Sequence, residues 1–252
     1  MCQLDALRKC TSPAALKKTL RTLPRTLYET YDRILANIGE EEREGAFRLL
    51  QWLAFFVRPI SLDEAVEVLA TDPDAEEGEP VFDPQRRFYD PRDVLMMCSS
   101  LVTLTASKDH WFPTRDAETD VEQSFESLSG MQVIILAHFS VREYLTSDHL
   151  RTREERMSFY YFNERLADTS IAKTCLAYLL EFDEDGATRS APQLYALSDY
   201  AARSWIHHAQ SDGGNSDTLH RLIMTLFEIR GFLCKLAIHA SNMVFQMSAG
   251  GV

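Results

Sequence analysis

The sequence predicts a mainly helical fold that carries one small β-hairpin, and three observations support this prediction. Apolar residues recur at the spacing of an amphipathic helix through most of the 252 residues. Two short β-prone runs, 101–105 and 133–137, interrupt that period. Helices precede these runs, and three helices followed by a hairpin is the element order of a winged helix-turn-helix. We therefore expect a winged helix-turn-helix with a small β-hairpin wing, followed by a helical segment.

Capping signals mark where two of the early helices begin. Thr26 and Glu29 stand at the capping-box offset before a run whose apolar residues fall on one helical face. Ser61 and Glu64 stand at the same offset before a second such run. Both helices are therefore predicted to start at these residues.

The segments around those two helices are less regular. Residues 47–57 are apolar nearly all the way round, which predicts a central buried helix that ends before Pro59. The acidic run 71–80 is predicted to be a loop, and a short helix with Pro91 in its first turn follows it. The polar segment 107–130 is too long for a tight hairpin turn, so we expect a mobile insertion within the wing.

Helical periodicity returns after residue 153 in three successive stripes, without a clean internal repeat. Helix pairs of this size can stack as in an α-solenoid. The stripes are Ile171, Cys175, Leu176 and Leu179, then Leu197, Tyr200, Ala201 and Trp205, then Leu219, Leu222, Ile223 and Leu226.

Composition excludes several classes of function. The chain has 26 Lys and Arg against 38 Asp and Glu, a formal charge of -12, which disfavours binding to phosphate backbones. The N-terminal stretch is locally basic, as either a solvated helix face or a docking face for an acidic neighbour. The five cysteines are odd in number and scattered, and no signal core or membrane span is evident, so a cytoplasmic location is expected.

Motifs for catalysis, metals and cofactors are missing from the sequence. No glycine is followed by lysine, so there is no P-loop, and the Gly-x-Ser-x-Gly nucleophile motif is absent as well. There is no Cys-x-x-Cys or His-Glu-x-x-His pattern, and His207 and His208 point to different helix faces. We therefore expect no enzyme, no metal site and no cofactor.

One histidine stands where a strand runs into a helix. His138 follows the second β-prone run, and Ser140 and Glu143 are at the capping-box offset of the next helix. A histidine there can donate to an anion or phosphate, or it can bond a backbone carbonyl and pin the wing to the helix. The residues alone favour the second role.

Four runs in the following order carry a resemblance to a known family: 23–35, 48–70, 94–102 and 135–147. They resemble the region after the NTPase in fungal NACHT–ankyrin proteins, which are NLR-like STAND proteins. This region includes the winged-helix domain catalogued under GPI inositol-deacylase. The resemblance covers roughly residues 1–210 and implies four segments. They are residues 1–40, the end of the NACHT-associated helical region; 41–150, the winged-helix domain with a disordered insertion at 107–130; 151–235, a helical domain; and 236–252, a tail.

The resemblance also implies a role for His138. In NACHT receptors a histidine in a His-x-Ser/Thr-x-x-Glu-Phe/Tyr run contacts the phosphate of bound ADP and holds the resting state. His138, Ser140, Glu143 and Tyr144 match that run. By resemblance His138 is the nucleotide sensor, with the other three as support, and the chain is a non-catalytic regulatory region that couples nucleotide state to a C-terminal ankyrin-type repeat array. The NACHT domain itself is not in the chain, so it would act in cis or in trans.

Two other functions stay open. The chain could be a stand-alone adaptor or truncated gene product that binds other proteins. A DNA-binding winged helix is disfavoured, because the expected third helix, 61–70, carries Asp63, Glu64 and Glu67 on a surface that would face phosphate. Neither nucleic acid nor a membrane is expected as a partner.

Overall fold

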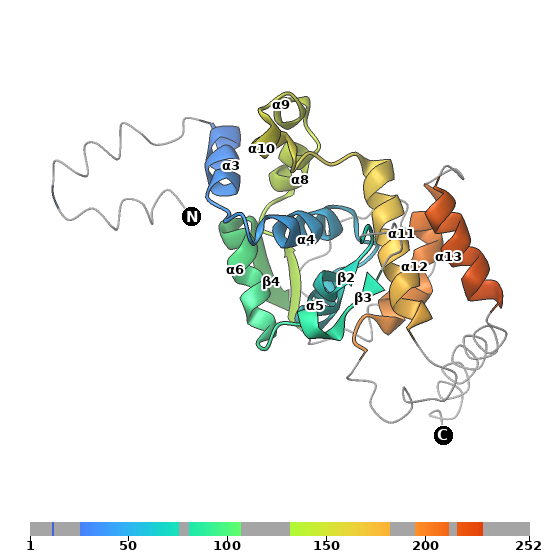
Figure 1. Ribbon diagram of the computed structural model, residues 1–252. Helices are drawn as coiled ribbons and strands as arrows, with labels where there is room; N and C mark the ends of the chain where they lie inside the picture. The colour runs from blue at the N-terminus through green and yellow to red at the C-terminus, as the bar shows by residue number, and fades with distance from the viewer. Residues whose placement is uncertain are drawn as a thin grey trace, which may run out of the picture. The chain divides into compact units, whose positions relative to one another are not determined.

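The computed structural model describes residues 26–75, 81–106, 132–181, 195–211 and 216–228, together with Ser12 (Figure 1). The fold is mainly helical, as predicted, and it contains small antiparallel sheets. Predictions made for residues 1–25, 107–130 and 236–252 fall outside these ranges. Within them, no helix combines the length and the apolar character needed to cross a membrane.

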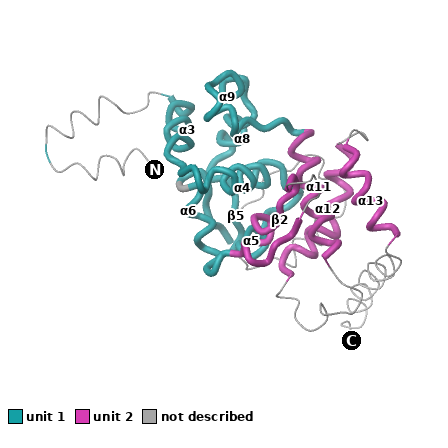
Figure 2. Tube along the Cα trace, viewed as in Figure 1, with its two compact units in different colours: residues 1–66, 88–164 teal, residues 67–87, 165–252 magenta. Residues whose placement is uncertain are grey.

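The chain divides into two compact units (Figure 2). Unit 1 contains residues 1–66 and 88–164, and unit 2 contains residues 67–87 and 165–252. The grouping of residues 67–87 with the helices that come after residue 165 was not predicted, since no local pattern connects segments so far apart in the chain.

The first two helices in the described part of unit 1 were both predicted. Helix α3 (Leu27–Ala36) starts at Thr26, whose hydroxyl accepts a hydrogen bond of 3.1 Å from the backbone N–H of Glu29. Helix α4 (Arg43–Phe55) is buried along most of its length and ends before Pro59. The helix predicted at 47–57 therefore exists, but it starts and ends earlier than expected.

The predicted hairpin is present in unit 1. Strand β4 (Val102–Ala106) pairs antiparallel with β5 (Gln132–Leu136). A third strand, β1 (Ile60–Ser61), pairs with the other edge of β5, so the strand order is β1-β5-β4. The two-residue β1 was not predicted, because a run this short has no recognisable alternation.

A reciprocal capping box starts α5 (Leu62–Ala70), as predicted. The backbone N–H of Glu64 donates to the Ser61 hydroxyl (3.1 Å), and the backbone N–H of Ser61 donates to the Glu64 carboxylate (2.7 Å). The predicted short helix also forms, as a 3₁₀ turn at Pro91–Asp93 that runs into α6 (Val94–Cys98). A second 3₁₀ turn (Ser99–Leu101) then leads into β4.

Short helices follow β5 in unit 1: α8 (Phe139–Leu145), α9 (Asp148–Arg151) and α10 (Glu155–Ser158). The chain that follows them packs on α4 through aromatic rings. The ring centroid of Phe47 lies 4.8 Å from that of Phe159 and 5.1 Å from that of Phe162. This aromatic cluster fixes the chain beyond α10 against the central helix.

The described part of unit 2 contains the last residues of α5, a two-stranded sheet and three longer helices. Strand β2 (Thr71–Asp72) pairs with β3 (Val81–Phe82), and a 3₁₀ turn (Pro84–Arg86) follows. The prediction of a loop for the whole run 71–80 was therefore wrong at its start, because Thr71 and Asp72 gain strand partners about ten residues further on.

The helices of unit 2 are α11 (Glu164–Leu180, whose first residue belongs to unit 1), α12 (Ser198–Gln210) and α13 (Asp217–Glu228). The three predicted apolar stripes are buried on these helices, except for Ile223, which is half-buried. Strand β3 contacts α11 through two aromatic residues. The ring centroid of Phe82 lies 4.9 Å from that of Tyr178.

Candidate functional site

His138 lies between β5 and α8 and is the N-cap residue of α8. Its backbone is extended, and its Nδ1 accepts a hydrogen bond of 3.2 Å from the backbone N–H of Ser140. The predicted capping box of Ser140 and Glu143 was therefore wrong. His138 itself is the cap, two residues before Ser140, and Glu143 is exposed on α8.

Ser140 does not cap the helix because its buried hydroxyl forms hydrogen bonds with two other side chains. Its Oγ lies 2.6 Å from His138 Nδ1 and 2.8 Å from the phenol oxygen of Tyr31 on α3. Tyr31 and Ser140 are only 6% and 5% exposed, whereas His138 is exposed. The histidine ring lies 4.3 Å from the ring of Phe139, which is itself 57% exposed.

A second polar cluster joins α3 to the same part of unit 1. The phenol of Tyr144 donates to the Asp32 carboxylate at 2.6 Å, and Arg153 and His149 approach the other oxygen of that carboxylate. Burial, with the hydrogen bond to Asp32 as a second cause, raises the pKa of the Tyr144 phenol. Tyr144 therefore acts here as a hydrogen-bond donor that joins α8 to α3. Among the described residues, no hydrogen bond links Tyr144 to His138.

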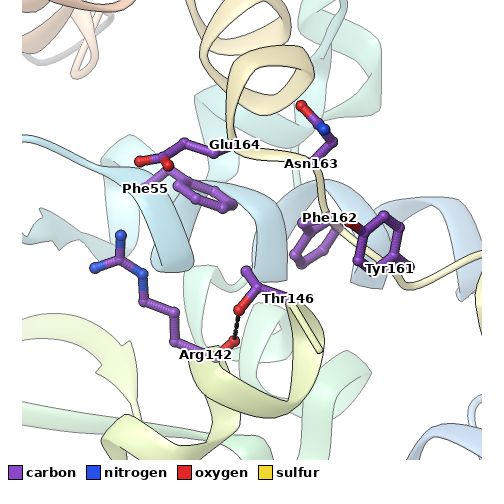
Figure 3. A pocket seen from close by; sticks show the side chains of 7 residues that line it. All are labelled: Phe55, Arg142, Thr146, Tyr161, Phe162, Asn163 and Glu164. Carbon is purple, nitrogen blue, oxygen red and sulfur yellow. Dashed lines mark hydrogen bonds between the residues drawn. The ribbon is translucent and has the colours of Figure 1, made fainter. Parts of the chain in front are cut away.

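A pocket of about 290 Å³ lies beside the second half of α8 in unit 1 (Figure 3). The guanidinium of Arg142 is 5.3 Å from the centre of the Phe55 ring, and the Thr146 hydroxyl donates to the Arg142 carbonyl (3.0 Å). None of the lining side chains is a histidine or a cysteine, two common catalytic bases and nucleophiles. Its lining residues are Phe55, Arg142, Thr146, Tyr161, Phe162, Asn163 and Glu164.

The described part of the chain offers no metal centre, since no group of three or more His, Cys, Asp and Glu side chains is placed there to hold an ion. Its two described cysteines, Cys98 and Cys175, are free and fully buried. Burial raises the pKa of both thiols, so little of either is in the reactive thiolate form at neutral pH.

These thiols are expected to be inert in the folded protein. In a background where the other three cysteines are serine, native Cys98 and Cys175 should react with a thiol reagent at least about 100-fold more slowly than in denaturant. A Met96→Cys variant supplies the matched control, because Met96 is 80% exposed on α6. Labelling of the two native thiols as fast as that of the introduced cysteine would contradict the expectation.

A buried polar cluster in unit 2 was missed by sequence reasoning. His208 is fully buried; its Nδ1 lies 2.9 Å from Asp168 Oδ1, and its Nε2 lies 3.0 Å from the phenol oxygen of Tyr200. His207 is exposed, so the prediction that the two histidines point to different faces is confirmed. The cluster ties α11 to α12, and its burial leaves no access for a substrate.

Comparison with known proteins shows a distant relative but no family. The chain is similar to the "Azaphilone pigments biosynthesis cluster protein L" of Monascus ruber, with 29% identity over 213 residues. The match covers 83% of this chain and 40% of that protein, so the chain spans about two-fifths of the relative's length. No protein-family model and no solved structure matches the chain.

Proposed function

We propose that this chain is a non-catalytic regulatory region of a NACHT-type signalling NTPase receptor, with His138 as its nucleotide sensor. The observation that carries this proposal is the exposure and the hydrogen bonding of the histidine in the His-x-Ser-x-x-Glu-Tyr run. His138 is exposed at the start of α8, and its Nδ1 is occupied by the Ser140 backbone N–H. The proton of the neutral ring is then on Nε2, where it can be donated to an oxygen of a bound phosphate.

The order of elements over residues 43–136 supports a winged helix-turn-helix. Helix α4, strand β1, helices α5 and α6, and the β4–β5 hairpin follow one another, with β1 added to the far edge of the hairpin. In this assignment the third helix is α6, which directly precedes the wing, and not the 61–70 helix. Helix α6 has the sequence VLMMC, without Lys, Arg, Asn or Gln, and it exposes Met96. This composition disfavours reading of DNA bases and favours contact with protein.

The partners in this proposal are a NACHT NTPase domain in cis or in trans and a downstream array of ankyrin-type repeats. The length of the Monascus ruber relative supports a longer polypeptide context, because the matched segment is only 40% of that protein. In the resting state the winged helix would lie on the NTPase, and activation would release it as a rigid body.

The first test is to sequence the transcript across both ends of this reading frame. The proposal predicts an in-frame P-loop upstream of residue 1. A message that starts at Met1 and stops after Val252, with no NTPase partner encoded beside it, would remove the nucleotide on which the switch depends. The adaptor function would then replace the proposed one.

A further inference from the structure

We propose that Tyr31 is a positioning residue for His138, acting through Ser140 to keep the proton of the histidine ring on Nε2. The geometry points to a directed chain of two hydrogen bonds between side chains, which starts in the buried interface between α3 and α8 and ends at the exposed ring. A third hydrogen bond, from a backbone N–H, fixes its direction. The role of this chain in sensing a phosphate rests on the proposed function, whereas the direction of the chain rests on the hydrogen bonds alone.

The direction of the chain is fixed at His138. A backbone N–H can only donate, so the 3.2 Å contact from Ser140 N to His138 Nδ1 makes Nδ1 an acceptor. A neutral imidazole with an accepting Nδ1 carries its proton on Nε2.

The roles of the two hydroxyl groups follow from that of the ring. Since Nδ1 carries no proton, the Ser140 hydroxyl 2.6 Å away must be the donor in that contact. The Ser140 oxygen is left as an acceptor, and the phenol of Tyr31, 2.8 Å away, must donate to it. The order of donation is therefore Tyr31 to Ser140 to His138.

Burial gives this order its strength. Tyr31 and Ser140 are both more than nine-tenths buried, so water does not replace either partner, and a broken bond would leave a buried polar group unsatisfied. Among the described residues, no hydrogen bond is made by Nε2, which leaves this nitrogen available as a donor. A neutral donor can bind an anionic oxygen at a pH where the ring carries no charge.

The chain of hydrogen bonds also makes the ring sensitive to the position of α3. Tyr31 belongs to α3, whereas His138 is the N-cap of α8 and Ser140 lies in its first turn. Movement of α3 away from α8 would remove the phenol and release the Ser140 hydroxyl. The tautomer of the His138 ring therefore depends on whether α3 stays packed against α8.

The test is the tautomer of His138, measured by ¹⁵N NMR of the imidazole nitrogens in the full chain without nucleotide. The pH is raised until the ¹⁵N shifts stop changing, so that the neutral ring is observed, and a His138→Gln variant assigns the signal. The wild type is expected to show protonated Nε2. Tyr31→Phe and Ser140→Ala should each lower the ratio of Nε2–H to Nδ1–H roughly fivefold, the change expected for one ordinary hydrogen bond. Ser140→Thr keeps the hydroxyl and should restore the ratio.

Tyr144→Phe is the matched control, because it removes another buried phenol from the same interface without touching the chain of hydrogen bonds. A wild-type ring protonated on Nδ1 would overturn the proposal, and so would a shift in Tyr144→Phe equal to that in Tyr31→Phe. The wild-type tautomer decides the direction of donation even if a variant fails to fold. Since no nucleotide is used, a protonated Nε2 together with unchanged ADP retention in His138→Ala would defeat the proposed function and leave the chain of hydrogen bonds standing.

Discussion

Replacing Glu64 with alanine is expected to destabilise unit 1 by about 3–5 kcal/mol, the usual cost of breaking a buried ion pair from one side. The Glu64 carboxylate is almost fully buried and accepts hydrogen bonds from both terminal nitrogens of Arg58, at 3.1 and 2.7 Å. It also accepts the backbone N–H of Ser61 at 2.7 Å. Without it, the buried guanidinium of Arg58 loses this counter-charge and α5 loses half of its capping box.

The measurement is the free energy of unfolding in urea, followed by circular dichroism. Asp63→Ala is the control, since Asp63 is the exposed neighbour on the same first turn of α5 and should cost only about 0.5 kcal/mol. A loss below about 1 kcal/mol for Glu64→Ala would contradict this expectation, since the buried pair would then contribute little to the free energy of unfolding.

Replacing His208 with alanine should destabilise unit 2 by about 3 kcal/mol or more. The change removes a fully buried ring and takes from the buried Asp168 carboxylate the Nδ1 contact at 2.9 Å. It also removes the His208 partner of the Tyr200 phenol. Because the cluster joins α11 to α12, amide hydrogen exchange in these two helices should accelerate together.

His207→Ala provides a control one position away on the exposed face of α12. It should change the free energy of unfolding by about 0.5 kcal/mol or less and leave hydrogen exchange in α11 unaltered. Equal effects of the two substitutions would mean that the buried cluster contributes nothing beyond the helix itself.

Local signals explain which parts of the fold could be predicted. The helix starts at Thr26 and Ser61 each depend on residues within three positions of the cap, so the sequence carries the whole motif. The β4–β5 hairpin was likewise visible as two β-prone runs. The two-residue strands β1, β2 and β3 were not, since each is defined only by its partner strand.

Contacts between distant residues explain the errors. Ser140 has the spacing of a helix cap, but a phenol 109 residues earlier in the chain occupies its hydroxyl, and His138 becomes the cap instead. Asp168 and His208 are 40 residues apart and match no motif, so their pairing is visible only after α11 and α12 pack. The sequence run therefore singled out His138 and Ser140 together, but it did not point to Tyr31, whose phenol contacts Ser140 only after α3 and α8 pack.

The most direct test of the sensor role is the rate at which ADP leaves the longest native protein that contains this chain. The protein is purified with its bound nucleotide, and ADP release is followed after addition of a competing nucleotide. His207→Ala serves as a control for loss of an exposed histidine, and circular dichroism confirms that each variant is folded. We predict that His138→Ala releases ADP at least about tenfold faster than the wild type, as expected for a lost hydrogen bond to a charged phosphate. Equal rates in His138→Ala and the wild type, or a native protein that holds no ADP, would contradict the sensor role.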